Sequence, residues 1–254
     1  MNEMIKMTNV SKRFGSITAL NSVDFEVYPK EIVALVGDNG AGKSTLIRII
    51  CGIWAPTSGE MWFEGQKVTR FSPENAGNMG IHAVHQGFGL VDTMTIERNV
   101  FLGEEPYKGG FLRILDFDKM RQASSDVLKI IGTRSQITPS AEVATLSGGE
   151  QQAIKIGRSV YHRAKLIIMD EPTMALSVRE RHRVLELARE TRDKGISVIF
   201  ISHNIHIVYD ICDRVVIMER GEIIGDFKKA EIDVEDLVEL IREGKQASTF
   251  KGNI

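Results

Sequence analysis

Short, mostly apolar runs recur along the chain, and the stretches between them carry apolar residues at helical spacing. Four such runs start near Ile32, Ile81, Leu166 and Ser197. Apolar strands of this kind are typical of a parallel sheet whose two faces are both covered. Because strands that alternate with helices indicate an α/β fold, the pattern predicts a parallel core sheet built from these four segments.

Further strand candidates indicate antiparallel pairing. The chain turns at Glu64-Gly65 between two of them, and at Arg220-Gly221 near its end, and both dipeptides suit a hairpin. The sequence therefore predicts a small antiparallel β subdomain beside the core and a terminal hairpin. The predicted strands are 4–10, 23–27, 59–63, 66–68, 214–218 and 222–225.

No strong β pattern occurs in the middle of the chain, where 117–131 has helical spacing. This region predicts a helical subdomain inserted into the α/β core. A short helix over 234–242 is expected to close the fold, with loose residues after it. The predicted division is a core of 1–86 and 163–227, a helical subdomain of 87–162, a single domain of 1–244 and a tail of 245–254.

Composition and charge exclude several classes of protein. The formal net charge is −2 and no block of five or six like charges occurs, so no strongly basic nucleic-acid-binding face is indicated. Two cysteines, Cys51 and Cys212, lie far apart in apolar helix candidates and are interpreted as buried free thiols. No apolar run approaches the roughly 20 residues of a membrane span, and the first residues lack a signal-peptide pattern. We therefore expect any membrane association to depend on a partner.

The strongest chemical signal is a glycine-rich segment between an apolar strand candidate and a helix candidate. It satisfies the pattern G-x-x-x-x-G-K-[ST], which needs this strand–loop–helix context to be credible. Bare glycine backbone lets N–H groups point at phosphate oxygens, and the helix N-terminus adds positive partial charge. The alternative, an ordinary glycine-rich turn, explains none of the other motifs. The segment consists of Gly37, Asp38, Asn39, Gly40, Ala41, Gly42, Lys43, Ser44 and Thr45.

Two carboxylates follow the third buried strand candidate. Asp170 and Glu171 end the run 166–169, at the edge where open α/β sheets place their ligands. Asp170 suits magnesium binding, and Glu171 suits a general base that activates water. The alternative is an acidic strand end that caps a helix.

A third motif, Leu146-Ser147-Gly148-Gly149-Glu150-Gln151-Gln152, precedes a helix candidate over 153–161. Ser147 and Glu150 have capping-box spacing, so an ordinary helix start is one explanation. Two glycines in a first helical turn cost about 1 kcal/mol each relative to alanine. Such a cost is reasonable if the backbone must come close to something, and a phosphate at the helix N-terminus is the natural candidate.

Together these motifs closely resemble the ATP-binding subunits of ABC transporters, over about residues 4–227. The resemblance implies a P-loop NTPase core of RecA type, with ATP and Mg²⁺ as ligands. The glycine-rich segment matches the Walker A motif of that family, the strand that ends in Asp170 and Glu171 matches Walker B, and the third motif matches the signature sequence. The match to the signature sequence implies that Ser147, Gly148 and Gly149 contact nucleotide. The resemblance also implies a magnesium site of Ser44, Gln86 and Asp170.

Smaller motifs carry over residue by residue. Gln86 resembles the family glutamine that touches magnesium and the attacking water, and His203 resembles the histidine that contacts the γ-phosphate. With Glu171 they form the implied catalytic set. Phe14 resembles the aromatic that stacks on adenine, with core packing as its alternative and Tyr28 as the competing aromatic.

One position departs from the common family pattern. Most members read S/A-A-L-D after Walker B, whereas this chain reads Met174-Ala175-Leu176-Ser177. A serine at 177 resembles the ATPases of ribose-type monosaccharide importers, many of which are tandem proteins. The resemblance thus implies an ATPase that energises a sugar importer by ATP-driven dimer closure. Alternatives are a carrier of another small solute, or a soluble ABC ATPase such as an iron–sulfur assembly scaffold.

The resemblance also implies partners and a location. Expected partners are a second ATPase subunit (a homodimer in the assembled transporter), an integral membrane permease and, indirectly, an extracytoplasmic solute-binding protein. The implied location is the cytoplasmic face of the cell membrane, as a peripheral subunit. The sequence does not specify the solute, since in such importers the ATPase does not contact it.

Overall fold

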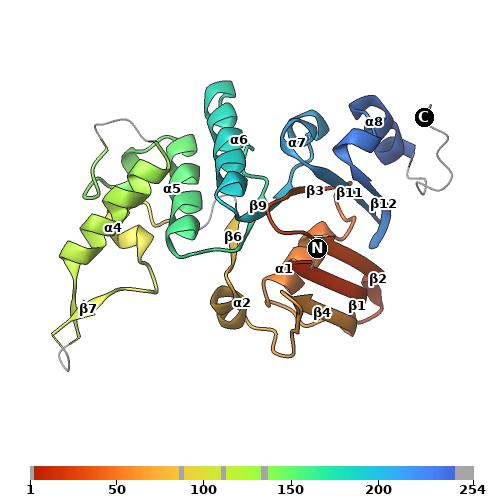
Figure 1. Cartoon of the computed structure of the whole chain (residues 1–254), viewed down its shortest axis with the longest axis horizontal. Helices are drawn as coiled ribbons and strands as arrows, with labels where there is room; N and C mark the ends of the chain where they lie inside the picture. The colour runs from red at the N-terminus through yellow and green to blue at the C-terminus, as the bar shows by residue number, and fades with distance from the viewer. Residues whose placement is uncertain (1–2, 86–88, 110–112, 133–136, 244–254) are drawn as a thin grey trace. The chain divides into compact units, whose positions relative to one another are not determined.

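The computed structural model describes residues 3–85, 89–109, 113–132 and 137–243 (Figure 1). The chain divides into two units. The first comprises Met1–Ala83, Lys165–Glu171 and Ala188–Ile254, and the second comprises Val84–Ala164 and Pro172–Leu187. Residues 172–187, which were predicted to belong to the core, cluster with the helical unit.

A six-stranded sheet forms the centre of the first unit. Its order is β12-β11-β3-β10-β9-β6. Strand β3 lies between β10 and β11 and pairs in parallel with both, whereas β12 pairs with β11 in antiparallel orientation. The four predicted core strands and the terminal hairpin are confirmed. The strands are β3 (Ile32–Val36), β6 (Ile81–His85), β9 (Leu166–Asp170), β10 (Ser197–Ile201), β11 (Arg214–Glu219) and β12 (Glu222–Lys228).

The predicted antiparallel sheet is also present, in the order β2-β1-β4-β5. The turn at Glu64-Gly65 has φ values of 48° and 76°, as a tight hairpin turn requires. Strands β1 and β2 run further than predicted, because Phe14 pairs with Ile17 and leaves a two-residue turn. The strands are β1 (Ile5–Phe14), β2 (Ile17–Val27), β4 (Ser58–Phe63) and β5 (Gln66–Lys67).

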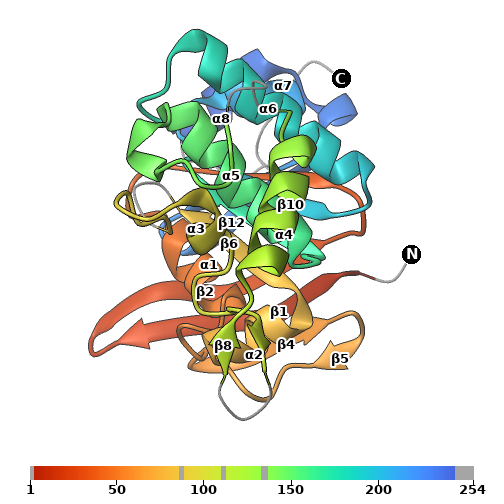
Figure 2. The same ribbon diagram turned by 90° about the vertical axis from the view of Figure 1, so that its left-hand side faces the viewer.

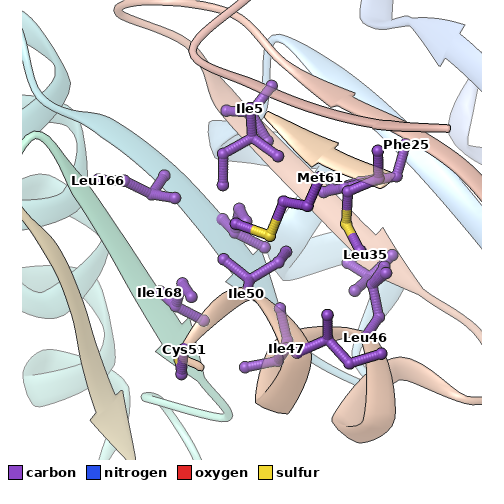
Figure 3. Close-up of a cluster of buried hydrophobic side chains, with 14 of the residues drawn as sticks. Ile5, Phe25, Leu35, Leu46, Ile47, Ile50, Cys51, Met61, Leu166 and Ile168 are labelled. Carbon is purple, nitrogen blue, oxygen red and sulfur yellow. The ribbon is translucent and has the colours of Figure 1, made fainter. Parts of the chain in front are cut away.

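Helix α1 (Lys43–Ile50) joins the two sheets through one hydrophobic core. Its apolar side chains recur at helical spacing and are almost fully buried. Figure 3 shows Leu46, Ile47 and Ile50 of this helix beside Leu35 of β3 and Ile168 of β9. This packing fixes the start of α1 at the carboxyl edge of the sheet. Both cysteines are buried and free, as predicted.

Three further helices belong to the first unit: α2 (Pro73–Met79), α7 (Ile205–Ile211) and α8 (Val234–Glu243). A 3-10 helix, Lys229–Glu231, precedes α8. Helix α2 begins at Ser72, whose Oγ accepts a hydrogen bond from the Asn75 amide at 3.1 Å. The predicted terminal helix is confirmed as α8.

The second unit is mainly helical, and its helices α4 and α5 can be followed in Figure 2. Helices α4 and α5 pack closely because Gly157 has no side chain: a Cβ there would lie 2.7 Å from the Ile131 side chain. Arg183 Nη2 donates to the Ile131 carbonyl at 2.8 Å, which ties 172–187 to this unit. The elements are α3 (Ile96–Val100), β7 (Tyr107–Lys108), β8 (Ile114–Leu115), α4 (Phe117–Ile130), a 3-10 helix (Val143–Thr145), α5 (Gly148–Tyr161) and the part of α6 (Val178–Asp193) up to Leu187.

Helix α4 confirms the predicted helix over 117–131, and α5 begins five residues earlier than predicted, inside the third motif. The hairpin β7–β8 and helix α6 are additions that the sequence analysis did not predict. Within the described part of the chain, no helix has the length and apolar character to cross a bilayer.

Candidate functional site

The glycine-rich loop lies between β3 and α1, as predicted. Gly37, Gly40 and Gly42 have φ values of 143°, 88° and 105°, which side-chain-bearing residues rarely adopt. Gly42 is the N-cap of α1, and no side chain of the described residues caps that helix start. The amides of the first turn are therefore free to meet an anion.

Strands distant in sequence hold this loop in shape. A Cβ on Gly37 would lie 2.1 Å from the carbonyl oxygen of Met218 in β11. The Gly221 amide donates to the Ala41 carbonyl at 2.9 Å, and the Asn21 amide donates to the Gly221 carbonyl at 2.8 Å. The β11–β12 turn thus supports the loop from outside.

Lys43 folds back onto the loop. Its Nζ donates to the carbonyl oxygens of Gly37 at 2.6 Å and Asp38 at 2.9 Å. Burial lowers the pKa of Lys43 from its ordinary value, although the negative charges of Glu171 and Asp38 oppose the shift. The ammonium is therefore partly desolvated, and a phosphate oxygen is a stronger acceptor than the neutral carbonyls it now meets.

A cavity of about 470 Å³ lies over the loop. Its charged lining combines Lys43 and Arg220 with Asp170 and Glu171. The turn that carries Arg220 was predicted from the sequence, but no role was predicted for the Arg220 side chain or for Ile17, which is 68% exposed. The lining residues are Ile17, Thr18, Ala19, Asn39, Gly40, Ala41, Gly42, Lys43, Ser44, Thr45, Asp170, Glu171, Ile201 and Arg220.

Glu171 and His203 meet at the carboxyl edge of the sheet. The Glu171 amide donates to the Ile201 carbonyl at 3.0 Å, which bridges the ends of β9 and β10. Its Oε1 accepts from the His203 amide at 2.9 Å, and its Oε2 lies 3.0 Å from His203 Nδ1. Facing a carboxylate, Nδ1 is the protonated ring nitrogen. Glu171 has a φ of 48°, so this strand end turns sharply to place the carboxylate.

The cavity offers oxygen donors suited to magnesium. Ser44 and Asp170 both line it, and a hydroxyl plus a carboxylate is a donor set that Mg²⁺ accepts alongside water and phosphate oxygens. Gln86, the third predicted magnesium residue, lies outside the described residues. Among the described residues, no three His, Cys, Asp or Glu side chains form a cluster that could hold a metal ion.

The third motif belongs to the second unit, where Ser147 caps α5. Its Oγ accepts from the Glu150 amide at 3.4 Å, and Glu150 Oε2 accepts from the Ser147 amide at 2.9 Å. The capping box expected from the spacing is therefore real. A Cβ on Gly148 would lie 3.0 Å from Leu176, and one on Gly149 would lie 2.8 Å from Glu180. Both glycines thus accommodate the chain's own segment after Asp170-Glu171.

Phe14 lies at the end of β1, and its ring packs edge-on against Trp54 with centroids 4.7 Å apart. Lys12 Nζ lies 5.1 Å from the Phe14 centroid. The ring is 39% exposed, but Phe14 is not among the residues that line the cavity. Tyr28 donates its hydroxyl to Glu26 at 2.7 Å, which gives it a structural role in β2 and its turn.

Comparisons with known proteins identify the family to which the chain belongs. The family described as ABC transporter matches residues 20–174. The xylose/arabinose import ATP-binding protein XylG of Sulfolobus acidocaldarius is 42% identical over 241 residues, which are 95% of this chain and 94% of that protein. The chain belongs to the ABC transporter family.

Other relatives of this ABC chain are longer. The ribose import ATP-binding protein RbsA of Yersinia pestis is 38% identical over 94% of the chain, which spans only 46% of that protein. A dimeric ATP-binding cassette solved in a post-hydrolysis state with ADP and Pi is 26% identical, with a TM-score of 0.74 over 89% of this chain and 99% of that one. The predicted α/β nucleotide-binding fold is confirmed as that of an ABC ATP-binding cassette.

Proposed function

We propose that this chain is the ATP-hydrolysing subunit of an ABC importer for a monosaccharide. The observation that carries the proposal is that Lys43, Asp170 and Glu171 line one cavity, with His203 bound to the Glu171 carboxylate. The curated relatives XylG and RbsA, named for xylose/arabinose and ribose import, supply the substrate class.

Each side chain has a distinct role in the proposed reaction. The amides at the start of α1 and the Lys43 ammonium bind the terminal phosphates of ATP. Ser44 and Asp170 hold Mg²⁺, which neutralises phosphate charge when bound. Glu171 accepts a proton from the attacking water, and its contact with the His203 amide and ring fixes both groups relative to each other.

The proposed working unit is a dimer. Ser147–Gly149 of one subunit would face the ATP held by Gly37–Thr45 of the other, and a two-fold axis makes two such sites. The dimeric cassette with ADP and Pi supports pairing in this family. ATP favours the closed pair and hydrolysis releases it. The proposed partners are an identical ATPase subunit, an integral membrane permease and, indirectly, an extracytoplasmic binding protein, with the subunit peripheral on the cytoplasmic face.

Glu171→Gln tests the proposed base. Glutamine keeps an oxygen that can accept from the His203 amide but cannot take a proton from water. We expect turnover to fall roughly 10²-fold to 10⁴-fold with ATP affinity kept, measured by phosphate release and calorimetry. Glu64→Gln, a surface carboxylate paired with Lys165, is the matched control and should retain activity. Near-normal turnover in Glu171→Gln would exclude Glu171 as the base.

Transport itself needs a separate measurement. Tagged protein should co-purify with a multi-span permease from gently solubilised membranes. Vesicles that hold this complex, supplied with the binding protein, should take up a pentose only with ATP. A purely soluble complex would favour the non-transport ABC ATPases instead.

A further inference from the structure

Glu180 connects the starts of two helices in the second unit. In the first turn of α6, its Oε2 accepts from the Ser177 amide at 3.1 Å and from Ser177 Oγ at 2.7 Å. Its Oε1 accepts from the amide of Gly149 at 3.2 Å. A single carboxylate therefore caps α6 and also occupies an amide at the start of α5.

The approach of these two segments is close and depends on glycine. A Cβ on Gly149 would lie 2.8 Å from both Cβ and Cγ of Glu180. Any other residue at 149 would push the carboxylate away from the amide. The bare backbone at this position thus has a partner inside the chain, in addition to the phosphate that the motif is expected to bind.

Glu180 is an anion at neutral pH. The Ser177 hydroxyl, followed by the amides of Gly149 and Ser177, lowers the pKa of Glu180 to about 2. Carboxylate and phosphate oxygens use the same kind of donor at a helix N-terminus. Two anions at one amide would repel each other, so a phosphate oxygen can accept from Gly149 only if Glu180 gives up that bond.

We infer that in the free subunit Glu180 binds the Gly149 amide at the start of α5. The γ-phosphate of ATP bound to a second copy then displaces Glu180 from this amide. The inference rests on the proposed function, because it assumes pairing of two subunits across ATP. Glu180 is then a positioning residue that sets how tightly ATP draws two subunits together. The same carboxylate binds Ser177 through its other oxygen, so its displacement from Gly149 is coupled to the start of α6.

Glu180→Gln tests the inference, since it removes the charge but keeps the shape and an accepting oxygen. The experiment uses the full chain with Glu171→Gln as background, so that hydrolysis does not dissolve the pair. Dimerisation is measured by analytical ultracentrifugation with Mg²⁺ and ATP over a range of protein concentrations. We expect the concentration for half-maximal dimer to fall roughly 3-fold to 10-fold, with ATP affinity at the Lys43 site unchanged.

The matched control is Glu186→Gln, the same change on the same helix. Glu186 pairs only with His182 and Arg183 in the described contacts, so its loss should leave dimerisation unchanged. Circular dichroism checks that each variant is folded. If Glu180→Gln does not fold, Ser177→Ala weakens the tether but keeps the charge, and we expect a fall of roughly 2-fold to 3-fold.

The outcomes are distinguishable. A dimerisation concentration that stays the same or rises in a folded variant overturns the inference and leaves Glu180 as a helix cap. If the Glu171→Gln background binds ATP but never dimerises, the proposed pairing fails, and this inference fails with it. If the background does not bind ATP at all, the proposed nucleotide site is itself wrong.

Discussion

Within the phosphate loop, an added methyl group would make its closest contact at Gly37. Replacing it with alanine places a Cβ 2.1 Å from the Met218 carbonyl oxygen, on a backbone with a φ of 143°. The dihedral strain is worth roughly 1–3 kcal/mol, and the overlap with backbone about another 1–3 kcal/mol. Alanine also restricts the unfolded chain more than glycine does, which raises the free energy of unfolding by about 0.4–1 kcal/mol. We expect a net loss of about 1–6 kcal/mol in the free energy of unfolding.

Gly40→Ala isolates the clash from the strain. Gly40 also has a positive φ, 88°, but nothing lies within 4 Å of its added Cβ. Its loss should stay below about 2 kcal/mol. Urea unfolding followed by circular dichroism gives both values, and nucleotide calorimetry on the folded protein reports the loop. We expect Gly37→Ala to lose ATP binding as well, because the carbonyl and the loop must move apart.

The two variants together can refute this reasoning. If Gly37→Ala unfolds within about 0.5 kcal/mol of Gly40→Ala, contact with Met218 does not constrain the loop. If both variants bind ATP with the affinity of the unmodified protein, then ATP binding does not depend on the loop conformation that the contact with β11 imposes.

Two further predictions concern charged side chains. Arg220→Gln should weaken ATP binding, measured by calorimetry, roughly 3-fold to 10-fold, and the effect should shrink at high salt. Arg13 does not line the cavity, so Arg13→Gln should leave ATP binding unchanged, and an equal effect of both variants would show that only the net charge matters. Lys43→Ala should weaken ATP binding at least as much as Arg220→Gln. Arg214→Met should lower the free energy of unfolding by about 3–5 kcal/mol, because it removes the cation paired with Glu31. The Glu31 Oε1 lies 2.8 Å from the Arg214 guanidinium, and the Glu31 side chain is only 13% exposed. Urea unfolding measures this loss, and a change below about 1 kcal/mol would contradict it.

Local patterns were sufficient for much of the architecture. Strand β3 consists of consecutive apolar residues and leads directly into the glycine loop. Strand β9 has four consecutive apolar residues before it ends at Asp170, which Glu171 follows. Because parallel strands align their carboxyl ends, sequence alone could bring these groups to one edge of the sheet. The capping box at Ser147 was likewise readable from a three-residue spacing.

Long-range contacts were not readable in the same way. Glu180 meets Gly149 across 31 positions, and Arg220 reaches the cavity only because the hairpin β11–β12 docks on the loop. Helix α6 is so rich in charged residues that its buried face gives a weak periodic signal. Predictions for Phe14 and Gln86 stay predictions, since the cavity lining omits the former and the latter lies outside the described residues.

The support that Gly221 gives to Ala41 has a consequence for synthesis on the ribosome. The loop sequence emerges early, but its outer brace lies about 180 residues further along the chain. At 5–20 residues per second that delay is roughly 10–40 s. During this interval the nascent chain carries every residue of the phosphate loop without the strand that shapes it. A truncated product ending before β11 would lack both the Gly221 amide that binds Ala41 and the Met218 carbonyl that borders Gly37.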